Sequence, residues 1–124
     1  MSDAIETKIQ IELWKVIEAY RMPGVRIWHV PNGERRDIKT AKRLKEMGVV
    51  PGVPDFHYFA RRKFGVLELK KPGGKLSKDQ IRFMDDADAQ GFRCDVAYSV
   101  IEAARILQAV GIIDPSIKFM EENT

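Results

Sequence analysis

The sequence is poor in cysteine and has no long apolar run. Cys94 is the only cysteine, so neither a disulfide nor a cysteine-based zinc site can form within one chain. A membrane-spanning helix needs about 20 consecutive apolar residues, and no stretch approaches this. The first residues, Ser2, Asp3 and Glu6 among them, lack the basic and apolar regions of a signal peptide. These absences predict a cytoplasmic protein without a membrane segment.

The apolar content is sufficient for one folded domain. The chain has 124 residues, of which 44% are hydrophobic, and this excludes a disordered protein. Its length predicts a single domain over residues 1–124 with its own core. The net charge of +3 is compatible with nucleic-acid binding, although the placement of the charges matters more than their sum.

The most informative stretch runs from Gly52 to Gln80. Asp55 opens one apolar run, Glu68 and Lys70 close a second, and the basic residues 61–63 between them predict a hairpin turn. Residues two apart in a strand point to the same face, so Glu68 and Lys70 project together. An antiparallel partner strand places Asp55 beside them. Two carboxylates and an ammonium are the groups needed to hold Mg²⁺ and activate water against a phosphodiester.

Each fragment of this stretch has an ordinary explanation when it is taken alone. Pro54-Asp55 is a common turn dipeptide, and Glu-x-Lys on a strand is most often a surface ion pair. The whole set is more specific: Gly-x-Pro-Asp, Glu-x-Lys thirteen positions on, a Gly-Gly loop, and a Ser-x-x-Gln helix start. This set resembles the PD-(D/E)xK nucleases. More narrowly, it resembles the VRR-NUC (virus-type replication-repair nuclease) family. Asn-Gly-x-Arg at 32–35, ahead of an Ala-x-x-Leu-Lys helix and Gly-Val, also resembles the phage-associated, stand-alone type of that family.

Periodicity and turn signals predict eight elements in the order α-β-α-β-β-α-β-α. We expect helices near residues 5–20, 38–47, 78–90 and 100–110, and strands near 25–30, 56–59, 64–70 and 92–98. An α/β fold with a mixed β-sheet and helices on both faces accommodates this order. The restriction-endonuclease-like core implied by the family resemblance is similar.

The first helix carries a carboxylate on its apolar stripe. Glu6 falls within that stripe, at an angle between Leu13 and Ile17, whereas Glu12 lies just outside the opposite edge. Asp3 and Glu6 also have the spacing of a capping box, which is a purely structural explanation. The sequence alone does not decide between these interpretations. The family resemblance implies a metal contact from a glutamate on this helix and favours Glu6, with Glu12 as the alternative.

Two other polar side chains also have competing interpretations. Gln80 has the spacing of a capping box with Ser77, while the family resemblance implies an active-site polar contact for it. His29, at the end of a predicted strand, is more simply a packing or surface residue than a catalytic base.

Basic residues gather on the second helix and on the loop that follows Lys70. They form either a solvated face or a surface that contacts DNA phosphates and delivers DNA to Asp55. We favour phosphate contact, and the expected DNA-binding residues are Arg35, Arg36, Lys39, Lys42, Arg43, Lys71 and Lys75.

The family resemblance implies the chemistry of the site. Asp55, Glu68 and the backbone carbonyl of Leu69 would bind Mg²⁺, or Mn²⁺ as a substitute, and Glu6 would join through water or at a second metal position. Lys70 would orient the attacking water and neutralise charge on the phosphate. No histidine and no organic cofactor is needed.

The expected function is therefore a metal-dependent DNA endonuclease. The family resemblance implies a homodimer that prefers branched, junction or flap DNA, in replication, recombination or repair. The alternative is a non-catalytic nucleic-acid-binding module with a lost or structural acidic site. The presence of Asp55, Glu68 and Lys70 together argues against it. A nucleotide- or sugar-acting enzyme is disfavoured because no phosphate-loop or dinucleotide motif is present.

Overall fold

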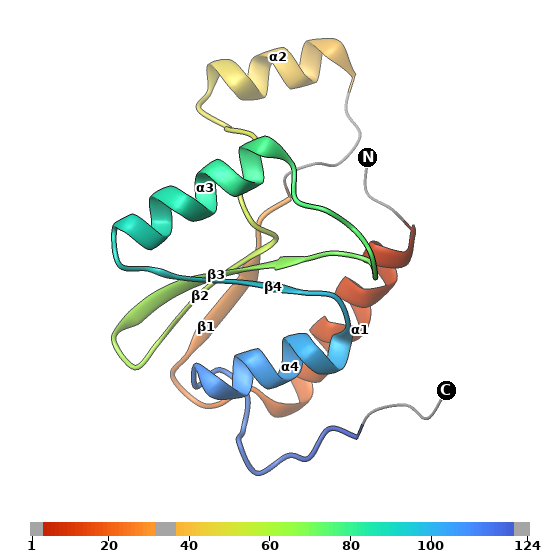
Figure 1. Ribbon diagram of the computed structural model, residues 1–124, viewed down its shortest axis with the longest axis vertical. Coiled ribbons are helices and arrows are strands. Elements are labelled where there is room, and N and C mark those ends of the chain that lie inside the picture. Colours follow the sequence, from red (N-terminus) through yellow and green to blue (C-terminus); the bar gives the residue numbers. More distant parts are fainter. Residues whose placement is uncertain (1–3, 32–36, 121–124) are drawn as a thin grey trace.

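The computed structural model describes residues 4–31 and 37–120, which form helices and strands in the predicted order (Figure 1). The helices are α1 (Ala4–Tyr20), α2 (Ile38–Glu46), α3 (Lys78–Ala89) and α4 (Val100–Ala109). The strands are β1 (Arg26–His29), β2 (Phe56–Ala60), β3 (Lys63–Leu69) and β4 (Arg93–Ala97). None of the helices in these ranges has the length and apolar character that a membrane span requires.

The strands form one mixed sheet in the order β1-β2-β3-β4. β1, β2 and β3 pair antiparallel, whereas β3 and β4 pair parallel and are joined by the crossover helix α3. The register pairs Phe56 with Leu67, so Asp55 and Glu68 are the next residues on their strands, at one end of the hairpin. This arrangement confirms the predicted fold class.

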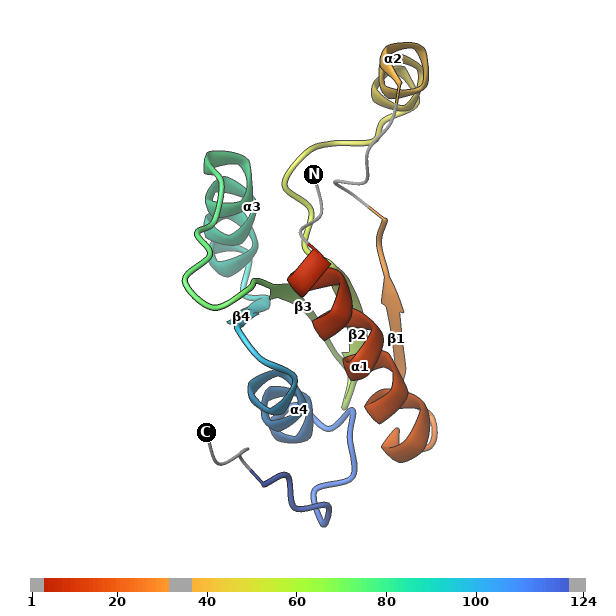
Figure 2. The ribbon, with the colours of Figure 1, turned by 90° about the vertical axis from the view of Figure 1, so that its right-hand side faces the viewer.

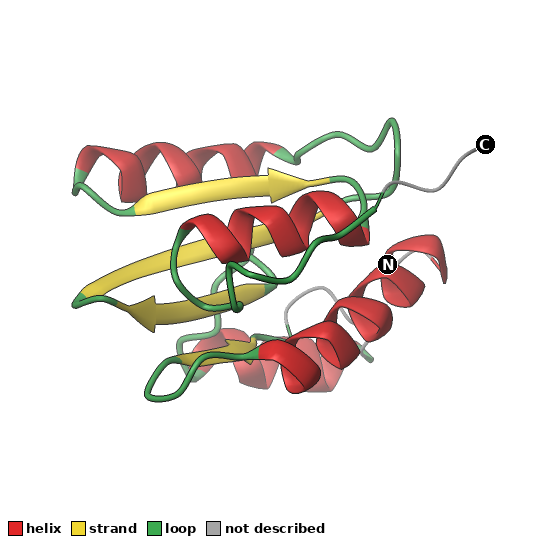
Figure 3. Cartoon of the chain, turned by 90° about the horizontal axis from the view of Figure 1, so that it is seen from below, coloured by secondary structure: helices red, strands yellow, loops and turns green. Residues whose placement is uncertain are grey.

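The sheet separates two helical layers, as Figures 2 and 3 show. α1 and α4 cover one face and bury the main core, to which β2 and β3 contribute Phe56, Tyr58, Leu67 and Leu69. α3 lies on the other face, toward which Glu68 points. The alternation predicted for β3 is therefore correct: leucines on one side, and Glu68 on the other.

Two helices bury less of their predicted apolar stripe than expected. Leu13 and Ile17 of α1 are buried, but Ile5 and Tyr20 are 54% and 40% exposed, because they lie at the two ends of the helix. Ile81 of α3 is 46% exposed, and no residue of α3 is fully buried. In both helices, the spacing of apolar residues predicted which side faces the sheet. It did not predict how much of that side the sheet covers.

α2 stands apart from the layered body (Figure 1). The Asp37 side chain caps its start by accepting a hydrogen bond from the Thr40 N–H at 2.7 Å. None of its residues is buried, and Ile38 and Met47 nearby are 87% and 73% exposed. The apolar side of this helix is therefore available for contact.

Candidate active site

Asp55 and Glu68 meet at the end of the hairpin, and each carboxylate accepts a hydrogen bond from a backbone N–H of the other strand segment. The Asp55 N–H donates to Glu68 Oε1 at 3.1 Å, and the Leu69 N–H donates to Asp55 Oδ2 at 2.8 Å. These cross-strand bonds fix both carboxylates on the backbone. The pairing of β2 with β3 thus creates the carboxylate pair predicted from the sequence.

The segment before Asp55 explains the Gly-x-Pro-Asp motif. Gly52 has a φ of +83°, and a Cβ atom there would lie 2.5 Å from the Asp79 backbone at the start of α3. Pro54 is fully buried. Only glycine allows this close approach in that conformation. The motif therefore sets the backbone course that places Asp55 next to Glu68.

Burial of the pair changes its acid–base behaviour. Glu68 is only 4% exposed. Burial, together with the charge of Asp55, raises the pKa of Glu68 to about 8. Burial also raises the pKa of Asp55, although the Leu69 N–H opposes this effect. Without a cation, Glu68 is therefore largely protonated at neutral pH.

Lys70 and Gln80 both approach Glu68. Lys70 Nζ lies 3.7 Å from Glu68 Oε2, and Gln80 Nε2 donates to the same oxygen at 2.8 Å. Gln80 Oε1 meanwhile accepts from the Ser77 N–H at 2.8 Å, and Ser77 Oγ accepts from the Gln80 N–H. The two interpretations of Gln80 are compatible, because its side-chain amide caps α3 through Oε1 and contacts Glu68 through Nε2.

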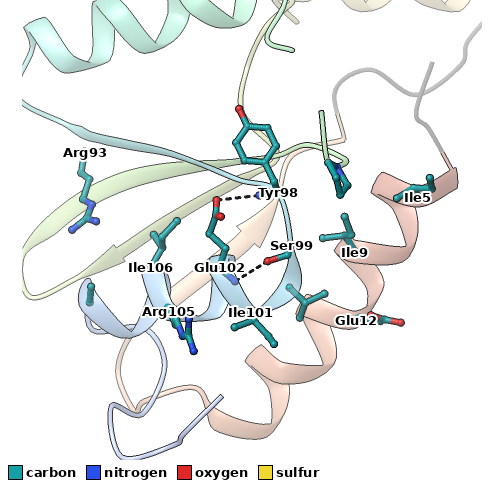
Figure 4. Close-up of a pocket in the computed structure, with 13 residues that line it drawn as sticks. Ile5, Ile9, Glu12, Arg93, Tyr98, Ser99, Ile101, Glu102, Arg105 and Ile106 are labelled. Carbon is teal, nitrogen blue, oxygen red and sulfur yellow. Dashed lines mark hydrogen bonds between the residues drawn. The ribbon is translucent and has the colours of Figure 1, made fainter. Parts of the chain in front are cut away.

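The structure separates the two glutamates considered on α1. Glu6 is half-buried, and its charge contributes to the raised pKa of Asp55. Glu12 is exposed and lines a hollow between α1 and α4, with Ile9 and Ile101 (Figure 4). Glu6 is therefore the helix carboxylate that faces the pair. Asp3, the capping partner expected from the spacing, lies outside the described residues.

His29 has a structural role that the sequence did not indicate. Its Nδ1 lies 2.8 Å from the backbone carbonyl oxygen of Asp55, which also accepts from the Val30 N–H at 2.8 Å. Because a carbonyl only accepts, Nδ1 is the donor. His29 pairs with Phe56 across β1 and β2, so this contact depends on a strand pairing between segments far apart in sequence.

The predicted DNA-binding residues lie in two places. Lys39, Lys42 and Arg43 are exposed on α2, and Lys71 and Lys75 lie on the loop that leaves β3 at the carboxylate end. Arg35 and Arg36 lie outside the described residues.

The donor atoms at the pair suit a hard divalent cation. Among the described residues, no group of three or more His, Cys, Asp and Glu side chains is placed to hold a metal ion. Mg²⁺ does not need such a cage, since it usually binds through one or two carboxylates and keeps several waters. Two adjacent carboxylates with raised pKa values fit this mode.

The family model that matches the chain is the VRR-NUC domain, over residues 5–101. The match includes Glu6, Asp55, Glu68, Lys70 and Gln80. The chain belongs to the VRR-NUC family. VRR-NUC domains are nuclease domains, so this chain is a nucleic-acid-processing domain for which DNA is the expected partner.

A solved VRR-NUC structure supports the fold. The chain described as "VRR_NUC domain protein" is 21% identical to this VRR-NUC chain, with a TM-score of 0.72. The similarity covers 92% of this chain and 96% of that one. No curated protein matches the sequence.

Proposed function

We propose that this VRR-NUC domain is a Mg²⁺-dependent DNA endonuclease that accepts Mn²⁺ as a substitute. The observation that carries the proposal is the pair of carboxylates, Asp55 and Glu68. They are held together by cross-strand hydrogen bonds although burial raises the pKa of both. Such an arrangement is costly for folding alone, and a divalent cation would compensate it.

Asp55, Glu68 and the Leu69 carbonyl would hold the ion, with Glu6 as a further contact through water or at a second position. When bound, the ion lowers the pKa of a coordinated water and polarises the phosphate. Ionisation of Glu68 is required before it can act as a ligand, so binding releases a proton.

The other side chains position these groups and supply charge. Lys70, 12% exposed and beside Glu68, would orient the attacking water and stabilise negative charge on the phosphate. Gln80 holds one oxygen of Glu68, and His29 holds the Asp55 carbonyl. Because both supports are in place without substrate, the carboxylates need little rearrangement during the reaction.

DNA phosphates would be contacted by Lys39, Lys42 and Arg43 of α2 and by Lys71 and Lys75 of the loop after β3, together with Arg35 and Arg36. Such contacts read backbone charge and shape rather than base sequence.

The exposed apolar side of α2 supports assembly as a homodimer, which would present two active sites with two-fold symmetry.

An apolar groove between α1 and β1 supports selectivity for branched or flap DNA. It has a volume of about 590 Å³ and is lined by Trp14, Trp28, His29 and Phe56, among others. Trp14 and Trp28 are 36% and 37% exposed. Exposed indole rings stack on unpaired bases, and such bases occur at flaps and junctions but not within an intact duplex.

The proposal is tested by cleavage of labelled linear, flap, fork and four-way DNA, with Mg²⁺ and with chelator. We expect cleavage to require metal, to be fastest on branched substrates, and to fall at least 100-fold in Asp55→Ala and Lys70→Ala. Glu12→Gln is the matched control and should cut normally. DNA binding without metal-dependent cleavage would instead favour the non-catalytic binding module, and a monomer in light scattering would refute the dimer.

A further inference from the structure

A cavity rich in basic residues lies between the tip of the β2–β3 hairpin and the end of α4. Figure 1 shows these two elements ending on the same side of the molecule. Its volume is about 510 Å³, and its lining includes Tyr58, Arg61, Arg62, Lys63 and Arg93. From Lys63 at this tip to Glu68, β3 spans about 17 Å at ~3.4 Å per residue. The cavity is therefore separate from the carboxylate site.

Tyr58 supplies a buried hydroxyl that has no hydrogen-bond partner among the described residues. Tyr58, Gly65 and Arg93 are neighbours on three successive strands. A Cβ atom on Gly65 would overlap the Tyr58 hydroxyl, so the glycine makes room for the ring to cross β3. Tyr58 is only 3% exposed, and leaving a buried donor unpaired costs free energy.

The positive charge around this hydroxyl is only partly compensated. Within the described ranges, no salt bridge involves Arg61, Arg62 or Lys63, whereas Arg93 pairs with Asp95 at 2.7 Å. That pairing uses Arg93 Nε and Nη2 and does not involve Nη1. The cavity thus combines several cationic groups with an unpaired donor, a set that matches an anion.

The turn has arginine at two positions whose left-handed backbone conformation disfavours it. Arg61 and Arg62 have φ values of 53° and 63°, the left-handed conformation in which two-residue hairpin turns usually place Asn-Gly. Their side chains contribute charge at the rim of the cavity despite this conformational cost.

We propose that the hairpin-tip cavity binds a phosphate group. The Tyr58 hydroxyl and Arg93 Nη1 donate to phosphoryl oxygens, and the three residues of the turn provide the surrounding charge. Burial raises the pKa of Tyr58 to about 12, so its hydroxyl remains a donor at neutral pH. The phosphate belongs either to a DNA backbone, which would extend the footprint beyond the carboxylate site, or to a free nucleotide.

The proposal is tested by calorimetric titration in chelator with a deoxynucleoside monophosphate and with a short blunt duplex. Tyr58→Phe and Arg62→Ala should each weaken binding of at least one probe by tenfold or more. Arg82→Ala, which removes an exposed arginine from α3, is the matched control and should not. Loss confined to the duplex identifies DNA as the source, and loss with the monophosphate identifies a nucleotide.

Thermal melting without ligand provides a second readout. Tyr58→Phe should melt at or above the wild-type temperature, because it removes an unpaired buried donor. A clearly lower melting temperature would show that the hydroxyl already has a structural partner and would overturn the proposal. Equal affinities of the wild type, Tyr58→Phe and Arg62→Ala for both probes would overturn it as well.

Discussion

Glu68→Gln should stabilise the metal-free protein at high pH and remove most of the pH dependence of its stability. The pKa of Glu68 rises from 4.5 in the unfolded chain to about 8 in the folded protein. Between these values the folded state binds more protons than the unfolded state. The free energy of unfolding therefore decreases as pH rises through this window.

The magnitude follows from the size of the shift. At about 1.4 kcal/mol per pKa unit, the rise to about 8 corresponds to at most about 5 kcal/mol of lost stability above pH 8. Glutamine is uncharged, so it avoids this loss. It cannot accept both the Asp55 N–H and the Gln80 amide as Glu68 does, and losing one such bond costs about 1 kcal/mol. We expect a net gain of at most about 4 kcal/mol at pH 9 and little change at pH 5.

Urea denaturation in chelator at several pH values from 5 to 9 measures this effect. Wild-type stability should fall across the series, whereas that of Glu68→Gln should stay nearly flat. Glu12→Gln, which removes an exposed carboxylate from α1, should follow the wild type. If wild-type stability is constant or rises with pH, and Glu68→Gln runs parallel to it, the raised pKa and its burial-based cause are refuted.

Three further substitutions test separate parts of the structure. Glu6→Gln should slow cleavage at least tenfold while Glu12→Gln does not, and equal rates for the two variants would remove Glu6 from the site. Gln80→Glu should keep the capping box of α3, as judged by an unchanged melting temperature at pH 5, but should slow cleavage strongly because it sets a third carboxylate against the pair. Replacing Arg61-Arg62 by Asn-Gly should raise stability by about 1–2 kcal/mol in urea denaturation, since it relieves two left-handed arginines; a less stable variant would show that the arginine side chains stabilise the tip.

The hairpin and its carboxylates could be predicted because their position depends on short-range rules. The alternation of side chains along a strand places Glu68 and Lys70 on the same face. The short turn sets the register that brings Asp55 opposite Glu68. Helical periodicity placed Glu6 on the apolar stripe of the first helix, and the family resemblance then favoured it over Glu12. For these residues, local spacing determines most of the three-dimensional position.

Contacts that depend on how elements pack could not be predicted in the same way. The double role of Gln80 requires the start of α3 to lie directly above Glu68, and the contact of His29 with the Asp55 carbonyl requires β1 to pair with β2. The exposure of Ile81 depends on how much of the sheet α3 covers. The unpaired hydroxyl of Tyr58 depends on a glycine in the neighbouring strand.

We propose Asp55 and Glu68 as the metal-dependent nuclease site of this domain. The most direct test is the single-turnover rate of cleavage of one labelled flap DNA by the wild type and Glu68→Gln, measured across a Mg²⁺ titration and in chelator. The wild type should cut only with Mg²⁺, with a rate that saturates. Glu68→Gln should remain folded and bind the DNA but cut at least 100-fold more slowly at every Mg²⁺ concentration. Cleavage by the wild type in chelator, or an unchanged rate in Glu68→Gln, would refute a metal site at these two carboxylates.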